Sequence, residues 1–186
     1  MPGSGERPPV LIPEAAIRER VRALGEQITR DYQSLDLVSP DFTSPDLVVL
    51  GVLKGAFMFV ADLVREIDLS VVVDFVSASS YGGERTSTGQ VKLIPGTWTD
   101  VEGRDVLVVE DVIDTGRTLD AIIAAVREHQ ARSVRTVALL RKPRARARID
   151  YVGFDIDDRF VVGYGLDDAG KWRHLSYIGF VTDMPS

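Results

Sequence analysis

The sequence predicts an α/β fold in which a mostly parallel, twisted sheet is covered by helices on both faces. All-apolar runs such as residues 47–50 are typical of strands that are buried on both faces. Segments with helical spacing of apolar residues alternate with these runs through the middle of the chain, which is the order that builds parallel β–α–β units. The 186 residues show no internal repeat, so we expect one domain over residues 14–186.

Three segments have apolar residues at the spacing of one helical face. In the first of them, Ile17, Val21, Leu24 and Ile28 share a face, and Pro13 suits the start of the helix. The expected helices cover residues 14–32, 56–67 and 118–130.

The expected strands are short apolar runs bounded by glycine or polar residues. The most convincing central strand is the run at 105–109, which reads Asp-Val-Leu-Val-Val. Residues 77–90 hold three glycines among hydroxyl residues, and we expect a mobile connection there rather than a packed element. The expected strands cover residues 47–50, 71–76, 105–109, 134–140, 151–156 and 160–164.

The composition excludes several classes of site and partner. The net charge is −6, so no overall field draws the chain to nucleic acid or to anionic membranes. The absence of cysteine excludes disulfides, thiolate metal sites and cysteine nucleophiles, and it fits a reducing cytoplasm. Residues 1–13 hold four prolines and no apolar signal-peptide core, so we expect a flexible tail. No apolar run approaches the length of a membrane span, and we expect a cytoplasmic protein.

An acidic turn is expected after the strand at 105–109. Glu110 and Asp111 stand at the carboxyl end of that strand, where open parallel sheets bind ligands, and Asp114 follows three residues on. Carboxylates beside a bound phosphate are favourable only if the ligand also brings hydroxyl donors or a cation, and a phosphorylated ribose with magnesium brings both. The alternative is an ordinary helix cap. Free N–H groups, a glycine and hydroxyls form a candidate phosphate cradle at the helix start: Thr115, Gly116, Arg117 and Thr118.

The whole string at 108–118, Val-Val-Glu-Asp-Val-Ile-Asp-Thr-Gly-Arg-Thr, resembles the signature of the type I phosphoribosyltransferases. Two other phosphate-binding motifs are absent: no G-x-G-x-x-G follows a strand, and no G-x-x-x-x-G-K-[ST] occurs. The resemblance implies the type I fold, with a small hood formed by the C-terminal segment. It also implies that the string binds phosphoribosyl pyrophosphate.

Further matches, from about residue 48 to the C-terminus, resemble the hypoxanthine-guanine phosphoribosyltransferases. Residues 51–57 match the pyrophosphate loop of that family. The resemblance assigns pyrophosphate binding to Leu53, Lys54 and Gly55 and implies that the Leu53–Lys54 peptide can be cis. From the residues alone, this segment is either an anion site at a helix start or a plain strand–helix turn.

Residues 79–89 resemble the flexible lid of the family, in which Ser80 and Tyr81 close over the reacting ribose. A lid has a chemical purpose here, because stray water would hydrolyse the oxocarbenium-like ribose carbon as pyrophosphate departs. The alternative is a hairpin without a site.

Residues 139–143 resemble the family segment in which a lysine hydrogen-bonds the 6-oxo group of the purine, and Lys142 is the match. Without the resemblance, the surrounding basic run is either a solvated loop or an RNA-binding patch. The run has five members within eight residues: Arg141, Lys142, Arg144, Arg146 and Arg148.

Residues 152–167 resemble the purine site of the family. The resemblance implies that Phe160 stacks on the base, that the Val161 backbone meets the base edge, and that Asp167 reaches a magnesium ion and the base. Taken alone, Phe160 is an ordinary core aromatic residue. Arg173 matches the arginine that binds pyrophosphate. The sequence departs from the family pattern at Asp168 and Trp172, which leaves a different packing open on the metal and pyrophosphate side.

The reaction implied by the resemblance transfers the 5-phosphoribosyl group from its pyrophosphate to nitrogen 9 of hypoxanthine or guanine. Glu110 and Asp111 would hold the ribose hydroxyls, directly or through magnesium, with Asp167 as a further metal ligand. Asp114 would accept the proton from the purine ring nitrogen as a modest general base. The chain is expected to assemble as a homodimer or a homotetramer.

Two other functions stay open at this point. Regulators with the same fold sense nucleotides and bind RNA or DNA, but the complete purine string and the lack of an appended DNA-binding domain disfavour such a role. A closer alternative is a xanthine- or adenine-specific enzyme of the same family. Lys142 as a donor to an oxo group disfavours adenine. The sequence does not rank hypoxanthine, guanine and xanthine.

Overall fold

A five-stranded sheet forms the centre of the structure, a computed structural model that describes residues 7–33, 47–77, 79–80, 91–92 and 99–181. The strand order is β3-β2-β6-β7-β8, and every neighbouring pair is parallel, which confirms the predicted α/β class. The strands of this sheet are β2 (Leu47–Leu53), β3 (Val71–Ser77), β6 (Asp105–Ile113), β7 (Ser133–Arg141) and β8 (Tyr151–Asp155).

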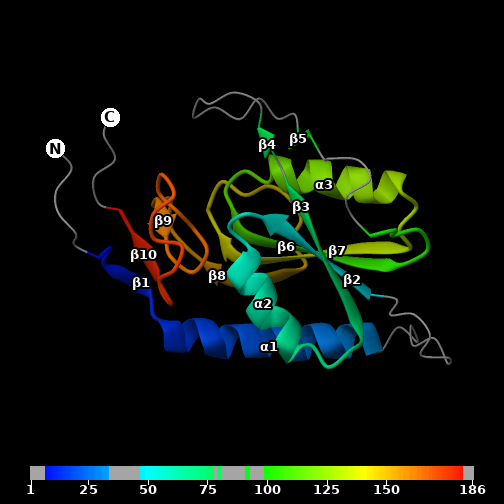
Figure 1. Cartoon of the computed structure of the whole chain (residues 1–186), viewed down its shortest axis with the longest axis horizontal. Helices are drawn as coiled ribbons and strands as arrows, with labels where there is room; N and C mark the ends of the chain where they lie inside the picture. Colours follow the sequence, from blue (N-terminus) through cyan, green and yellow to red (C-terminus); the bar gives the residue numbers. More distant parts are fainter. Residues whose placement is uncertain (1–6, 34–46, 78, 81–90, 93–98, 182–186) are drawn as a thin grey trace.

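Helices cover both faces of the sheet (Figure 1). Alternate residues of β2 enter different layers: Val49 packs with α1 (Glu14–Gln33) and α2 (Phe57–Glu66), whereas Val48 and Leu50 pack with α3 (Arg117–Glu128). All three valine and leucine side chains are fully buried, so the all-apolar run does mark a strand that is covered on both sides. Within the described residues, no helix combines the length and the apolar character that a membrane crossing requires.

A second, antiparallel sheet forms a hood at one end of the molecule (Figure 1). Its strand order is β1 (Val10–Ile12), β10 (Ile178–Phe180) and β9 (Val161–Val162). The predicted flexible tail at 1–13 is therefore wrong for residues 10–12. Tertiary pairing overrides the local proline signal, because Val10 pairs with Gly179 and the Ile12 side chain is buried.

Two predicted strands have different limits in the structure. The run at 105–109 continues to Ile113, so Glu110 and Asp111 lie inside β6 rather than in a turn. The run at 160–164 shortens to Val161–Val162 and belongs to the hood. It stops because residues 163–165 all have positive φ angles, which no strand can contain.

Part of the connection predicted at residues 77–90 lies in paired β-strands. The strand β3 extends to Ser77, and β4 (Ser79–Ser80) pairs antiparallel with β5 (Val91–Lys92). This pairing joins segments that are distant in sequence, so local composition does not reveal it. The backbone of Ser80 therefore lies in a strand, whereas Tyr81 and the rest of the predicted lid lie outside the described residues.

The contact between α1 and α2 gives a test of the fold at Gly25. A Cβ atom on Gly25 would lie 2.5 Å from the Glu66 Cβ and 2.6 Å from the Glu66 carbonyl oxygen. Alanine improves helix propensity over glycine by about 1 kcal/mol. Overpacking against a neighbouring backbone costs about 1–3 kcal/mol, which is the larger effect. We therefore expect Gly25→Ala to lower the free energy of unfolding, measured by urea titration.

The matched control is Glu26→Ala, at the next and exposed position of α1. This substitution should leave the urea midpoint nearly unchanged. A higher midpoint for Gly25→Ala than for the unmodified protein would show that helix propensity dominates and that the α1–α2 contact is looser than described.

Candidate active site

One cavity of about 400 Å³ lies where the carboxyl ends of the parallel strands meet the hood. This is the edge at which open α/β sheets bind ligands. The cavity collects predicted residues from four separate parts of the chain. It is lined by Lys54, Gly55, Asp111, Val112, Asp114, Lys142, Phe160, Val161, Leu166, Asp167 and Arg173.

The floor of the cavity depends on two close backbone approaches. A Cβ atom on Gly55 would lie 1.6 Å from the Asp111 Oδ2, so only glycine lets the turn after β2 reach this carboxylate. Gly165, with φ +98°, lies against the Gly55 backbone. A Cβ atom on Gly165 would lie 2.1 Å from the Gly55 carbonyl oxygen. The Leu53–Lys54 peptide is cis, in agreement with the resemblance.

A pair of buried carboxylates lies near the carboxyl end of strand β6. Burial, reinforced by the negative charge of Asp111 and a hydrogen bond with it, raises the pKa of Glu110 well above its usual range. Burial also raises the pKa of Asp111, although the Val112 N–H (2.8 Å) and the charge of Arg173 oppose the shift. Asp111 lines the cavity, whereas Glu110 does not. In the described part of the chain, the Glu110 Oε2 has no hydrogen-bond partner. Such a pair favours a cation or a ligand rich in donors.

Lys142 stands between two carboxylates at the mouth of the cavity. Its Nζ lies 3.9 Å from the Asp114 Oδ2 and 3.8 Å from the Asp158 Oδ1. The side chain of Lys142 is 12% exposed and that of Asp114 is 54% exposed. The Lys142 N–H donates to the Ile113 carbonyl (2.9 Å), which fixes this loop to the end of β6. Asp158 was not singled out from the sequence, because only the fold brings the loops after β7 and β8 together.

The predicted phosphate cradle lies at the start of α3, next to Asp114 along the chain. Gly116 is the N-cap of this helix, with φ +94° and no side-chain capping bond. The first N–H groups of a helix have no intrahelical acceptor, which makes them suited to an anion. Ala147 packs over Gly116, and the Arg146 N–H donates to the Thr115 carbonyl (3.2 Å). None of the four cradle residues 115–118 lines the cavity itself.

The hood supplies one aromatic face and one ion pair. Phe160 is 37% exposed, so it is not the core aromatic residue of the alternative interpretation. Asp167 forms an ion pair with Arg173 (2.5 Å) and accepts the Gly170 N–H (2.7 Å). Arg173 also donates to the Gly165 carbonyl (2.6 Å), which fixes its guanidinium against the hood.

The two departures from the family pattern lie in a tight turn beside this ion pair. Asp168 and Lys171 exchange backbone hydrogen bonds of 3.2 and 2.9 Å. Trp172 follows with φ +77°, an uncommon angle for a bulky residue. Both residues therefore shape the loop that carries Asp167 and Arg173.

The three predicted metal ligands do not form a ready-made metal site. Within the described residues, no group of three or more histidine, cysteine, aspartate or glutamate side chains is arranged to hold a metal ion. Asp111 and Asp167 line the same cavity, while Glu110 lies outside its lining. A metal at this place would therefore need ligand atoms from elsewhere.

The basic run at 141–148 is largely neutralised. Arg141 pairs with Asp155 at 2.6 Å, Arg144 pairs with Asp158, and Arg148 pairs with Asp150 at 3.5 Å. An RNA-binding patch needs clustered positive charge that is free to meet phosphates. These ion pairs favour the interpretation of the run as a solvated loop.

Comparisons with known proteins agree with this geometry. The model of the phosphoribosyl transferase domain matches residues 15–169. The chain is 45% identical to the hypoxanthine-guanine phosphoribosyltransferase of Bacillus subtilis over 91% of each chain. It is 43% identical to the hypoxanthine phosphoribosyltransferase of Escherichia coli, over 92% of this chain and 94% of that protein.

Solved structures give the same result. A crystal structure of a hypoxanthine-guanine phosphoribosyltransferase from Bacillus anthracis matches with a TM-score of 0.82 at 41% identity, covering 95% of this chain and 99% of that one. A hypoxanthine phosphoribosyltransferase from Trypanosoma cruzi matches with a TM-score of 0.83 at 37% identity, covering 92% and 94%. The chain therefore belongs to the phosphoribosyl transferase family, and within it to the hypoxanthine-guanine phosphoribosyltransferases.

Proposed function

We propose that the protein acts in purine salvage, transferring the 5-phosphoribosyl group of phosphoribosyl pyrophosphate to nitrogen 9 of hypoxanthine or guanine. The products are the purine nucleotide and pyrophosphate. The observation that carries the proposal is the single cavity in which Lys54, Asp114 and Lys142 meet beside the exposed ring of Phe160. Its relatives in Bacillus subtilis and Escherichia coli carry the names of this activity.

The donor would bind across the carboxyl ends of β2 and β6. The N–H groups and hydroxyls of residues 115–118 suit its 5-phosphate, because they start a helix that has no side-chain cap. Lys54 and Arg173 suit the pyrophosphate, and the absence of a side chain at Gly55 leaves room for it beside Asp111. The carboxylates of Glu110 and Asp111 would accept the ribose hydroxyls.

The carboxylates at the cavity are suitable ligands for magnesium. The ion is usually held by one or two carboxylates together with substrate phosphates rather than by an all-protein cage. Asp111 and Asp167 line the same cavity, and among the described residues the buried Glu110 Oε2 next to Asp111 has no hydrogen-bond partner. When bound, magnesium would supply positive charge next to the departing pyrophosphate. Lys54 and Arg173 of the chain would stabilise the same developing charge.

The purine would lie between the hood and the loop after β7. Phe160 offers an exposed ring for stacking, and the Val161 backbone lies next to it for the base edge. Lys142 would donate to the 6-oxo group. Asp114, more than half exposed and within 3.9 Å of the Lys142 Nζ, would accept the proton from the ring nitrogen.

Self-association of the chain is part of the proposal. Leu53, Phe57 and Val73 are 38%, 41% and 42% exposed, and a subunit contact over them would remove this apolar surface from water. We expect a homodimer or a homotetramer that functions in the cytoplasm.

Asp114→Asn tests the proposed base. An amide cannot accept the proton, so we expect kcat to fall by about 10²- to 10⁴-fold while binding of the donor, measured by calorimetry, is retained. Asp120→Asn, an exposed position in the first turn of α3, is the control and should keep full turnover. A near wild-type kcat for Asp114→Asn would remove the base assignment.

Lys142→Ala tests recognition of the purine. A charge-assisted hydrogen bond contributes about 1.5–3 kcal/mol, so we expect kcat/KM for hypoxanthine and guanine to fall by about 10- to 150-fold. The KM for the donor should change little. Arg146→Ala, in the same loop, is the control, because the Arg146 side chain is exposed. Unchanged kinetics with both purines would exclude Lys142 from base recognition.

Removal of divalent cations tests the magnesium proposal. A purified sample treated with excess chelator should lose turnover with the donor and guanine, followed by absorbance, and added magnesium should restore it. Full turnover in the presence of the chelator would contradict a metal requirement.

A further inference from the structure

Three consecutive residues of the hood have positive φ angles: Gly163 (+93°), Tyr164 (+49°) and Gly165 (+98°). The two glycines adopt this conformation without cost, but a tyrosine rarely does. A bulky residue persists in the left-handed region only where its surroundings hold it there, and such residues cluster at functional sites. Specific contacts must therefore hold Tyr164 in this conformation.

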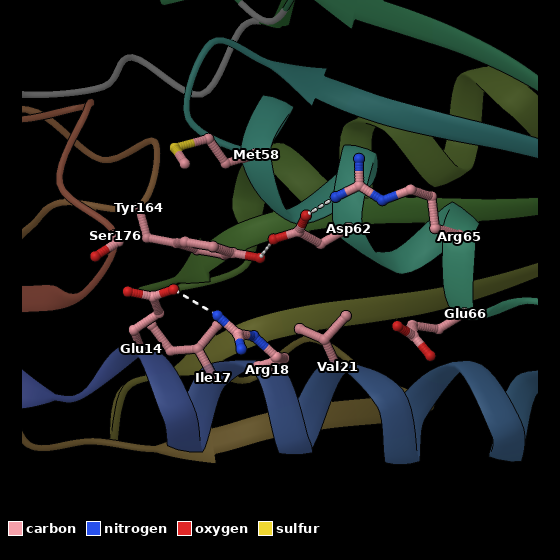
Figure 2. A pocket seen from close by; sticks show the side chains of 10 residues that line it. All are labelled: Glu14, Ile17, Arg18, Val21, Met58, Asp62, Arg65, Glu66, Tyr164 and Ser176. Atoms are coloured by element: carbon pink, nitrogen blue, oxygen red, sulfur yellow. Dashed lines mark hydrogen bonds and ion pairs between the residues drawn. The ribbon is translucent and has the colours of Figure 1, made fainter.

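Tyr164 reaches from the hood to helix α2. Figure 2 shows its ring extending along a cavity of about 340 Å³, walled by α1, α2 and the hood, towards Asp62. The ring is buried, and its hydroxyl donates to the Asp62 Oδ2 at 2.5 Å. Burial, together with the hydrogen bond to Asp62, raises the pKa of the Tyr164 hydroxyl above its usual range, so the hydroxyl remains a donor. The backbone N–H of Tyr164 donates to the Leu175 carbonyl at 2.8 Å.

The same turn contacts both sides of the proposed pyrophosphate site. Gly165 packs directly on the Gly55 carbonyl, two residues before α2 begins at Phe57. On its other side, Gly165 exchanges hydrogen bonds with Arg173: its N–H donates to the Arg173 carbonyl (2.9 Å), and its carbonyl accepts from the guanidinium (2.6 Å). The turn thus joins the Lys54–Gly55 loop to Arg173, the second positively charged residue of the proposed pyrophosphate site.

We infer that Tyr164 is a positioning residue for pyrophosphate: through Asp62 it ties the hood to α2 and so sets the separation between Lys54–Gly55 and Arg173. This inference rests on the proposed function and assigns a further residue pair to it. Neither Tyr164 nor Asp62 lines the proposed active-site cavity, so neither touches the substrate there. Their effect is on geometry, and a small misplacement of binding groups weakens both binding and turnover.

The hood is also held by other contacts, so removal of the Tyr164 hydroxyl should not unfold it. Strands β1 and β9 each pair with β10, and the buried side chains of Leu166 and Ile178 belong to the same core as α1 and α2. Asp62 also forms an ion pair with Arg65 through its Oδ1, the oxygen that the tyrosine hydroxyl does not use. Tyr164→Phe is therefore expected to fold and to retain the ring in its place.

The experiment compares Tyr164→Phe, Asp62→Ala and the double variant in steady-state kinetics, with pyrophosphate as an inhibitor. We expect each single variant to raise the KM for the donor and the inhibition constant of pyrophosphate by about three- to tenfold. The KM for guanine should change much less, because Lys142 is held by the Ile113 carbonyl (2.9 Å) and the Phe160 carbonyl accepts the Val181 N–H (3.0 Å). The double variant should be no worse than Asp62→Ala, since both changes break one interaction.

The matched control is Tyr177→Phe, which removes another hood hydroxyl, one that donates to the Pro8 carbonyl (2.9 Å) and not to α2. It should leave both constants unchanged. An unchanged donor KM in Tyr164→Phe would overturn the inference, and so would an equal rise in the guanine and donor KM with a lower melting temperature. Failure of the proposed function would be distinct, because the unmodified protein and Tyr177→Phe would then also lack turnover.

Discussion

The approach of Gly55 to Asp111 is the constraint on which the site depends. No side chain fits between the turn after β2 and the carboxylate at the end of β6, because even a Cβ atom would lie 1.6 Å from the Asp111 Oδ2. Gly165 of the hood then packs on the Gly55 carbonyl, which brings the hood against the turn after β2. The cavity lies beside this contact, and its residues come from the turn after β2, the end of β6 and the turn that follows it, the loop after β7, and the hood.

The chemistry of the site follows from charges that are enclosed at that contact. Two carboxylates with raised pKa values stand at the end of β6, and the charges of Lys142 and Arg173 lie around the same cavity. A buried carboxylate pair is unfavourable unless a ligand or cation compensates it. A phosphoribosyl donor would offer hydroxyls and a metal ion to the carboxylates, and phosphates to the positively charged side chains.

Local patterns predicted most of this from the sequence. The all-apolar runs located the central strands, and the residues assigned through the motifs at 51–57, 108–118 and 152–173 largely gather at one edge of the sheet. Predictions failed where pairing is non-local. Residues 10–12 form a strand only because β10 lies beside them, and Glu110 lies in a strand although two acidic residues resemble a turn. Asp158 and the Tyr164–Asp62 pair were missed because their partners are brought together by the fold alone.

The choice of purine tests the proposed function most directly, because Lys142, the proposed donor to a 6-oxo group, lines the same cavity as the exposed ring of Phe160. One steady-state comparison of kcat/KM for hypoxanthine, guanine, xanthine and adenine, with phosphoribosyl pyrophosphate and magnesium, is the measurement that tests it. We expect rapid nucleotide formation from hypoxanthine or guanine and little from adenine. Absence of turnover with every 6-oxopurine, or a preference for adenine, would contradict the assignment of this cavity.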